Sequence, residues 1–280
     1  MNRREFLVSS GVMFGAAALR MYGQTGKRPL GVQLYTLRKQ AKKDLPGVLK
    51  AVRDIGYEEV ETYWDVYNRP ATELKRLIND HGLRVPSGHF NYDGLEGKLD
   101  YAASLGVTYV ICPMLPDKAR TTLDDFKHAA DAFNKWGEKI KAMGMRFGFH
   151  NHNYEFHDLG NTTGFEILMS RTEPDLMCWE MDCYWITQAG RNPLEMFKTY
   201  GKRIRLLHLK DRKPGFPTTQ TLNKHAEHFT PPGTGTIDWK SILAAAQQDA
   251  IDHMFVEQDR GDIPQMEAAR VAFKNLQSLL

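Results

Sequence analysis

The chain alternates short apolar runs with longer stretches in which apolar residues recur at helical spacing. Four times a helix-like stretch ends at a glycine and an apolar run follows within a few residues, at Gly56, Gly82, Gly106 and Gly144. Glycine at these places suits the left-handed conformation that ends a helix. The pattern therefore predicts four helix–strand units. Four further strands are expected at residues 30–35, 176–181, 204–209 and 253–257.

Strands that alternate with amphipathic helices predict a parallel sheet. Eight of them in about 250 residues favour a closed barrel, with an open doubly wound sheet as the alternative. The open sheet loses support because the segment Gln33–Leu37 has no glycine-rich phosphate loop. We therefore expect an α/β protein with a (β/α)8 TIM barrel in residues 25–280. Residues 213–236 are rich in Pro, Thr and Gly and should form a functional loop over the barrel mouth.

The first residues differ in character from the rest of the chain. Arg3 and Arg4 precede a weakly apolar stretch, residues 8–19, which looks like a twin-arginine export signal. This stretch is shorter than the ~20 residues that a membrane-spanning helix needs, so cleavage is favoured over anchoring. We expect residues 1–24 to be a signal segment and the protein to be periplasmic or otherwise exported, without a stable membrane anchor. The alternative is a frayed N-terminal helix that happens to contain two arginines.

Composition and charge narrow the classes of function. A hydrophobic content of 42% and a charged content of 25% are ordinary for a soluble globular protein. The net charge of +3 comes from 37 basic and 34 acidic residues without a long basic run, which argues against a nucleic-acid partner. The cysteines, Cys112, Cys178 and Cys183, form no CxxC pair, so neither a zinc ribbon nor a disulfide framework is expected.

Polar residues follow most of the expected strands, at the end where active sites of such barrels lie. They are Glu59, Glu61, His89, the block from His150 to Glu155, Glu180, Asp182, His208, Lys210, Asp211, Glu257 and Asp259. Carboxylates crowded into a partly dry site repel one another unless a cation lies among them. The pattern therefore predicts a divalent metal with Asp182, His208 and Glu257 among its ligands. Such oxygen-rich sites suit several metals, and we rank Mn2+ first, ahead of Co2+, Mg2+ and Zn2+.

Each of these candidates also has a purely structural interpretation. His208 could be a hydrogen-bonded histidine of the barrel interior, and Glu257 could cap the following helix. Lys210 could lie on a salt-bridged surface as readily as contact a substrate. Tyr35 and Trp185 are candidates for stacking on the apolar face of a sugar, with core packing as an equal alternative.

Five blocks of the sequence carry a family resemblance. They are Gly31–Tyr35, Phe149–Phe156, Asp182 with Tyr184 and Trp185, His208–Asp211 and Val256–Asp259. Together they resemble the sugar phosphate isomerase/epimerase family with the xylose-isomerase-like barrel, which is also related to endonuclease IV. In that family Glu, Asp, His and Glu from strands five to eight hold the metal, which carries over onto Asp182, His208 and Glu257. For strand five we favour Glu155, because a loop can fold it back and it preserves the charge of the site. His150 and His152 are the alternatives.

The resemblance implies a metal-dependent isomerase or epimerase that removes a proton next to a carbonyl and passes through an enediolate. Glu155 and Glu257 would be the bases, while His89 and His150 would orient hydroxyls or relay protons. The residues expected to contact the substrate are Tyr35, Glu61, His152, Trp185 and Lys210. Because phosphorylated sugars are mostly cytoplasmic, a free sugar or keto-sugar is the better substrate for an exported protein. Relatives are often dimers or tetramers, so the resemblance also implies a homo-oligomer.

Three other functions are alternatives. The same metal, acid and base could eliminate an oxygen β to a keto group, as a 3-keto-glycoside lyase or hydratase would. The chain could also be a periplasmic carbohydrate-binding barrel without turnover, although retention of Asp182, His208 and Glu257 argues against this. A DNA repair role like that of endonuclease IV is disfavoured by the export signal and by the lack of a basic stripe.

Overall fold

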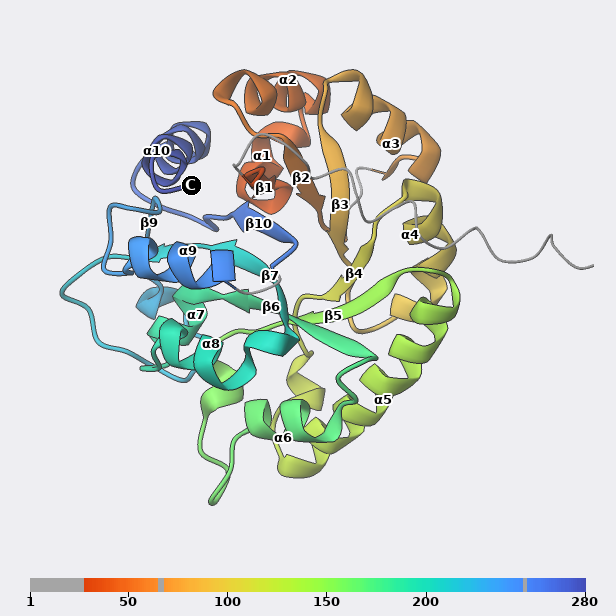
Figure 1. Cartoon of the computed structure of the whole chain (residues 1–280), viewed down its shortest axis with the longest axis vertical. Helices are drawn as coiled ribbons and strands as arrows, with labels where there is room; N and C mark the ends of the chain where they lie inside the picture. The colour runs from red at the N-terminus through yellow and green to blue at the C-terminus, as the bar shows by residue number, and fades with distance from the viewer. Residues whose placement is uncertain (1–27, 65–67, 249–250) are drawn as a thin grey trace, which may run out of the picture.

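The computed structural model describes residues 28–64, 68–248 and 251–280 (Figure 1). The predicted twin-arginine signal, residues 1–24, lies outside the described residues. In the part that is described, no helix is both long and apolar enough to cross a bilayer. Cys112, Cys178 and Cys183 are free thiols.

Within these residues eight parallel strands close into a barrel. They are β1 (Gly31–Gln33), β2 (Glu59–Thr62), β3 (Arg84–His89), β4 (Tyr109–Cys112), β5 (Arg146–His150), β6 (Met177–Asp182), β7 (Ile204–Leu209) and β10 (His253–Val256). Their order around the barrel is β1-β10-β7-β6-β5-β4-β3-β2, so the last strand closes against the first. The predicted (β/α)8 barrel is confirmed, and each strand lies in or next to a segment where the sequence predicted one.

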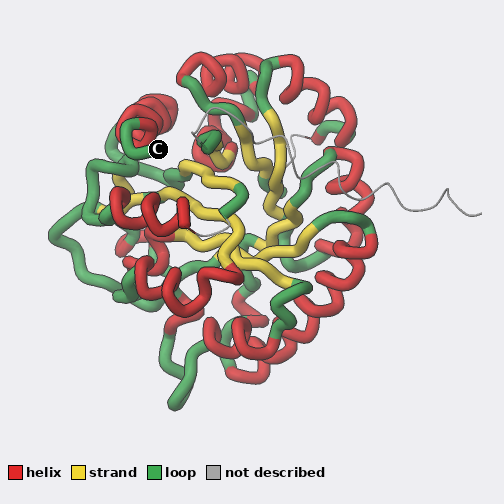
Figure 2. The backbone as a smooth tube through the Cα atoms, in the orientation of Figure 1, coloured by secondary structure: helices red, strands yellow, loops and turns green. Residues whose placement is uncertain are grey.

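Helices surround the barrel, as the tube in Figure 2 shows. They are α1 (Arg38–Ala41), α2 (Leu45–Ile55), α3 (Ala71–Asp80), α4 (Leu99–Leu105), α5 (Leu123–Ala142), α6 (Gly164–Arg171), α7 (Cys183–Gln188), α8 (Pro193–Tyr200), α9 (Trp239–Gln248) and α10 (Gln265–Gln277). The four glycines that predicted helix ends, Gly56, Gly82, Gly106 and Gly144, all have positive φ, between 72° and 120°. Left-handed backbone of this kind favours glycine, which confirms why these helices stop where they do.

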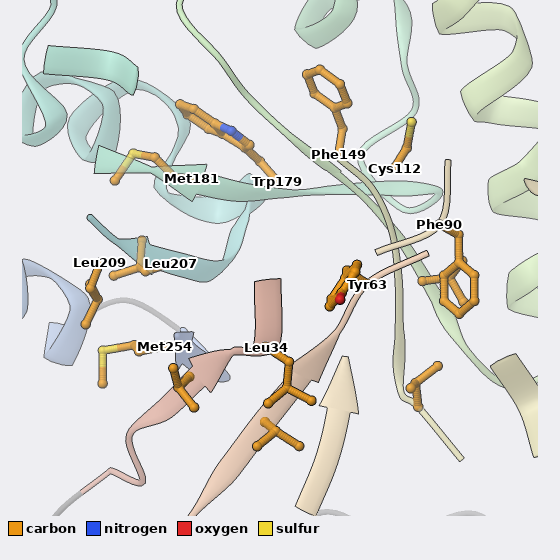
Figure 3. Packing of buried hydrophobic residues seen from close by; sticks show 14 of the residues in the cluster. Leu34, Tyr63, Phe90, Cys112, Phe149, Trp179, Met181, Leu207, Leu209 and Met254 are labelled. Carbon is orange, nitrogen blue, oxygen red and sulfur yellow. The ribbon is translucent and has the colours of Figure 1, made fainter. Parts of the chain in front are cut away.

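Alternation along the strands divides the apolar residues into two layers. On β6, Met177, Trp179 and Met181 point outward and join the main core between strands and helices, part of which Figure 3 shows. Cys112 and Cys183 belong to this layer as well. A smaller cluster fills the barrel interior towards its N-terminal end, formed by Tyr109, Ile111, Leu206 and Phe255. The barrel is therefore closed by side chains below the level of its polar residues.

The long segment after β7 is an ordered loop. Its start, β8 (Asp211–Arg212), pairs with β9 (Phe229–Thr230) in a two-stranded antiparallel sheet. The Asp211 carboxylate accepts hydrogen bonds from the backbone N–H groups of Gly233, Gly235 and Ile237 and from the Trp239 indole. Asp211 thus folds the loop back onto the start of α9. The predicted loop exists at the C-terminal end of β7, and its functional role stays a prediction.

Candidate metal centre in the barrel mouth

Polar side chains replace apolar ones in the upper half of the barrel interior. Two residues beyond the apolar Leu206 and Phe255, the inward positions of β7 and β10 hold His208 and Glu257. On β6 the inward positions after Cys178 are Glu180 and Asp182. Because side chains alternate along a strand and all strands are parallel, these groups converge at the C-terminal end of the barrel.

Four of these side chains form a group that could hold one metal ion. His150, Asp182, His208 and Glu257 each offer a ligand atom, and these atoms all lie within 4.8 Å of one another. His208 Nδ1 is 3.0 Å from Glu257 Oε2, and His150 Nε2 is 3.8 Å from Asp182 Oδ2. All four residues are buried, at 5% exposure or less. We call them the mouth group.

The local backbone explains how Asp182 is aimed. It is the N-cap of α7, and its Oδ1 atom accepts a hydrogen bond of 2.8 Å from the Trp185 N–H. Its own N–H donates to the Asn151 side chain at 2.9 Å, which ties the end of β6 to the turn after β5. One carboxylate oxygen is thereby used to start a helix, and the other is left for the barrel interior.

The residues of the mouth group fit a divalent cation. Asp182 Oδ2 is buried and accepts no hydrogen bond from any residue that the structure describes, while the Lys210 ammonium lies 3.3 Å away. Burying a carboxylate oxygen without a hydrogen-bond donor is unfavourable, so this oxygen is available to a bound cation. Two imidazoles and two carboxylates form a donor set that divalent transition metals and zinc accept. A metal would be held by His150, Asp182, His208 and Glu257.

Lys210 brings a positive charge to the same carboxylates. Its Nζ atom lies 2.7 Å from Glu257 Oε2, 3.3 Å from Asp182 Oδ2 and 3.3 Å from Asp259 Oδ2. Burial alone would lower the pKa of Lys210, but these carboxylates outweigh it and raise the pKa well above its usual value. Burial alone would raise the pKa of Glu257. The charges of Lys210 and His208 outweigh burial and hold this pKa well below its usual range. Lys210 is therefore an ammonium beside an ionised Glu257.

A second layer of polar groups lies behind the mouth group, formed by Glu61, His89 and Glu180. His89 Nε2 is 2.8 Å from Glu180 Oε2 and 3.1 Å from Glu61 Oε2. Burial opposes a charge on His89, but the two carboxylates outweigh it and raise its pKa to about 9. Burial and the neighbouring Glu61 raise the pKa of Glu180 to about 7. We call these three residues the inner layer.

The predicted substrate contact Glu61 and the predicted catalytic residue His89 thus lie inside the protein. Glu61 is fully buried, with Oε1 bonded to Ser87 Oγ at 2.5 Å and Oε2 bonded to Gln33 Nε2 at 2.7 Å and to His208 Nε2 at 2.7 Å. Both of its oxygens are therefore used by protein groups. His89 is 4% exposed. Glu61 and His89 thus lie behind the mouth group, and the roles expected of them stay predictions.

The structure does not bring Glu155 into the mouth group, and its role as the strand-five ligand stays a prediction. Glu155 lies in the 3-10 helix η5 (Tyr154–Phe156), where its Oε2 atom accepts a hydrogen bond of 2.9 Å from the His152 N–H. Among the described residues, His150 and not Glu155 completes the mouth group. The physical reason is local, because the tight turn lets the carboxylate bond to the backbone three residues earlier. Burial raises the pKa of Glu155 to about 8.

Aromatic side chains adjoin Lys210. The Trp185 ring lies 5.5 Å from Lys210 Nζ and 4.9 Å from the ring of His152. His152 is partly exposed, and its Nδ1 atom has no hydrogen-bond partner among the described residues. Tyr35 is half-buried and packs at 5.2 Å against Trp64, whose side chain is 42% exposed. Of the predicted substrate contacts, His152, Trp185 and Lys210 thus lie together beside the mouth group, whereas their contact with a substrate stays a prediction.

Sequence reasoning missed two residues of the site. Glu180 and Asp259 were recognised at strand ends but given no role. In the structure Glu180 contacts His89, and Asp259 contacts Lys210. The signal was present, because Glu180 lies two residues before Asp182, and Asp259 two residues after Glu257. Residues separated by two on a strand share a face.

Comparison with known proteins adds a family and relatives. The family described as xylose isomerase-like TIM barrel matches residues 49–279. An inosose dehydratase of Lacticaseibacillus casei is 28% identical over 263 residues, which cover 80% of this chain and 86% of that protein. The structural likenesses include a sugar phosphate isomerase/epimerase from Parabacteroides distasonis, with a TM-score of 0.76 and 24% identity, covering 91% of this chain and 97% of that one. The IOLI protein, whose structure has a zinc atom bound, gives a TM-score of 0.69 at 17% identity, covering 90% and 98%. At these identities the structural likenesses show the fold.

Proposed function

The chain belongs to the xylose isomerase-like TIM-barrel family, and from this premise we propose that it is a metal-dependent lyase that removes water or an alcohol from a keto-sugar or a similar ketopolyol. The observation that carries the proposal is the pair formed by Glu257 and Lys210, whose Oε2 and Nζ atoms are 2.7 Å apart at the mouth group. A proton acceptor and a proton donor side by side suit an elimination, which needs both.

Each residue of the site has a separate role in the proposed elimination. His150, Asp182, His208 and Glu257 would hold the metal, which when bound supplies a Lewis acid for the substrate carbonyl. Glu257 takes the proton from the carbon next to that carbonyl. The electron pair left behind forms a carbon–carbon double bond as the carbon–oxygen bond at the β position breaks. Lys210 gives a proton to the departing oxygen, and the contact between the two side chains then lets Glu257 return its proton to Lys210.

An isomerase or epimerase on the same site is the second candidate. It shares the first step, and solved structures with this fold include one described as a sugar phosphate isomerase/epimerase. Epimerisation also needs a second base that returns the proton on the opposite face, a role that we expected of Glu155. Glu155 is bonded to the His152 N–H instead. The elimination is therefore favoured, also because a curated relative is an inosose dehydratase.

The metal-loaded protein can be tested in D2O with a panel of ketopolyols, free keto-sugars and 3-keto-glycosides. We expect the wild type to form an unsaturated ketone and to need the metal. Lys210→Gln should still place deuterium next to the carbonyl but eliminate about 100-fold more slowly, because it keeps the base and loses the acid. Glu257→Gln should lose both reactions. Lys198→Met, which removes an exposed lysine paired with Glu195 on α8, is the control.

Two results would contradict this proposal. An epimer or isomer formed without loss of oxygen would establish the second candidate. A metal-loaded protein that exchanges no deuterium with any substrate of the panel would favour a carbohydrate-binding barrel. Circular dichroism of each variant checks that the barrel is folded.

We also propose that the resident metal is divalent. Two imidazoles in the mouth group make its donor set richer in nitrogen than expected, which moves our order of metals from Mn2+ towards Zn2+ and Co2+.

We also propose that residues 1–24 export the protein. Fractionation of cells that express the wild type or a variant with Arg3→Lys and Arg4→Lys tests this export. Equal amounts outside the cytoplasm for both would contradict it.

A further inference from the structure

His150 is held from two sides. Its Nε2 atom faces Asp182 Oδ2 of the mouth group at 3.8 Å, and its Nδ1 atom lies 3.2 Å from Glu180 Oε2 of the inner layer. A metal-bound imidazole generally donates its second N–H to a neighbouring carboxylate, so in the metal-loaded protein the nitrogen that contacts Glu180 is the one that carries the proton. The other nitrogen then presents a lone pair to the mouth group, on the side where Asp182 Oδ2 lies.

His208 repeats this arrangement with its ring turned the other way. Its Nε2 atom lies 2.7 Å from Glu61 Oε2 and 3.3 Å from Glu180 Oε2, both in the inner layer. Its Nδ1 atom faces Glu257 of the mouth group at 3.0 Å. Each imidazole therefore spans the two layers, and each uses a different nitrogen for the inner one.

We propose that Glu61 and Glu180 are positioning residues that select which nitrogen of each histidine binds the metal, Nδ1 of His208 and Nε2 of His150. The inference rests on the metal site of the proposed function and not on the reaction. Metal-bound imidazoles generally donate their second N–H to a carboxylate or carbonyl, which fixes the ring and strengthens the ligand. Two such carboxylates are built into this barrel.

The inner layer is braced so that its carboxylates stay in place. His89 bridges Glu61 and Glu180 through one nitrogen, at 3.1 Å and 2.8 Å. Ser87 and Gln33 occupy the remaining hydrogen-bonding positions of Glu61. Glu61 thus cannot turn towards the mouth without leaving several buried donors unpaired, which is unfavourable.

The rival interpretation puts the metal in the inner layer. His89, His150, Glu180 and His208 also offer ligand atoms within 4.8 Å of one another, and Glu180 Oε1 has no hydrogen-bond partner among the described residues. However, the two groups share His150 and His208. Filling both would require each imidazole to lose both of its N–H protons, so one group is the metal site and the other supports it. The rival predicts that Glu180 is a ligand and that Asp182 is dispensable.

Metal affinity separates these interpretations without any substrate, so its outcome is independent of the lyase reaction. Zn2+ and Co2+ affinities would be measured by chelator competition for the wild type, Glu61→Gln, Glu180→Gln and Asp182→Asn. Glu59→Gln is the matched control, since Glu59 is a buried β2 carboxylate bonded at 2.8 Å to His253, remote from the mouth group along the strand. The visible spectrum of bound Co2+ reports whether the ligand set has changed.

We expect one metal per chain in the wild type and a 10- to 100-fold loss of affinity in Glu61→Gln and Glu180→Gln, with the Co2+ spectrum preserved. Asp182→Asn should change the spectrum, and Glu59→Gln should bind as the wild type does. In zinc-loaded wild-type protein, 15N NMR should find the proton of His150 on Nδ1 and that of His208 on Nε2. Unchanged affinity in folded Glu180→Gln, a Co2+ spectrum altered by Glu180→Gln but not by Asp182→Asn, or the opposite tautomers would overturn the proposal.

Discussion

Replacing Glu155 by glutamine should stabilise the protein in alkaline solution without removing its metal. Glu155 is fully buried, and its Oε1 atom has no hydrogen-bond partner among the described residues. Burial raises its pKa from 4.5 to about 8. The carboxyl group is therefore protonated at neutral pH in the folded protein but ionised in the unfolded chain. Glutamine has nearly the same shape and stays neutral at every pH.

The sign and size of the effect follow from this difference in pKa. Between pH 4.5 and about 8 the folded state binds more protons at Glu155 than the unfolded state does, so the free energy of unfolding falls as the pH rises. The slope from this one group is about 1.4 kcal/mol per pH unit. Over the whole interval the free energy of unfolding of the wild type falls by about 5 kcal/mol through this group, whereas in the glutamine variant this contribution is absent.

Urea unfolding of the metal-free protein, followed by tryptophan fluorescence from pH 5 to pH 9, measures both curves. We expect the difference between variant and wild type to grow with pH up to about pH 8 and then to level off. Zn2+ affinity should be the same in the two proteins. Curves that stay parallel across this range would refute the buried, neutral acid, and loss of metal binding would restore Glu155 as a ligand.

Three further predictions follow from other parts of the structure. Asp211→Ala removes the acceptor that folds the loop onto α9. The free energy of unfolding should fall by about 3 kcal/mol, and proteolysis within residues 213–236 should become faster. An unchanged cleavage rate would contradict this. Gly31→Ala places a Cβ atom 2.4 Å from Phe255 Cδ1, so urea unfolding should show a loss of about 1–3 kcal/mol, and wild-type stability would contradict the tight contact between β1 and β10. Metal at a hundredfold excess over its dissociation constant should stabilise the wild type by about 2.7 kcal/mol, reversed by EDTA and absent in Asp182→Asn; equal stabilisation of the variant would exclude Asp182 as a ligand.

Much of the fold was predictable because it depends on local signals. Gly56, Gly82, Gly106 and Gly144 have the positive φ that their position after a helical stretch predicted. Most strands were visible as apolar runs because both the helix side and much of the lower interior of the barrel are apolar, whereas β2, with the sequence Glu-Val-Glu-Thr, was placed by the helix-ending glycine before it. Asp182, His208 and Glu257 were predicted for the same reason, since each stands where such a run ends.

Other features depend on side-chain partners that periodicity does not describe. Glu155 lies outside the mouth group because a 3-10 turn lets its carboxylate bond to the His152 N–H. Glu61 was placed in the correct strand, but its enclosure depends on Ser87, Gln33 and His208 from three other strands. No local pattern predicts that convergence.

The position of the bound metal distinguishes the mouth group from the inner layer and from Glu155. A crystal of the zinc-loaded protein, with data collected at the zinc absorption edge, would locate the ion by its anomalous signal. We expect one peak, about 2.0–2.3 Å from His150 Nε2, Asp182, His208 Nδ1 and Glu257. A peak bonded to His89 and Glu180, or one bonded to Glu155, would contradict it.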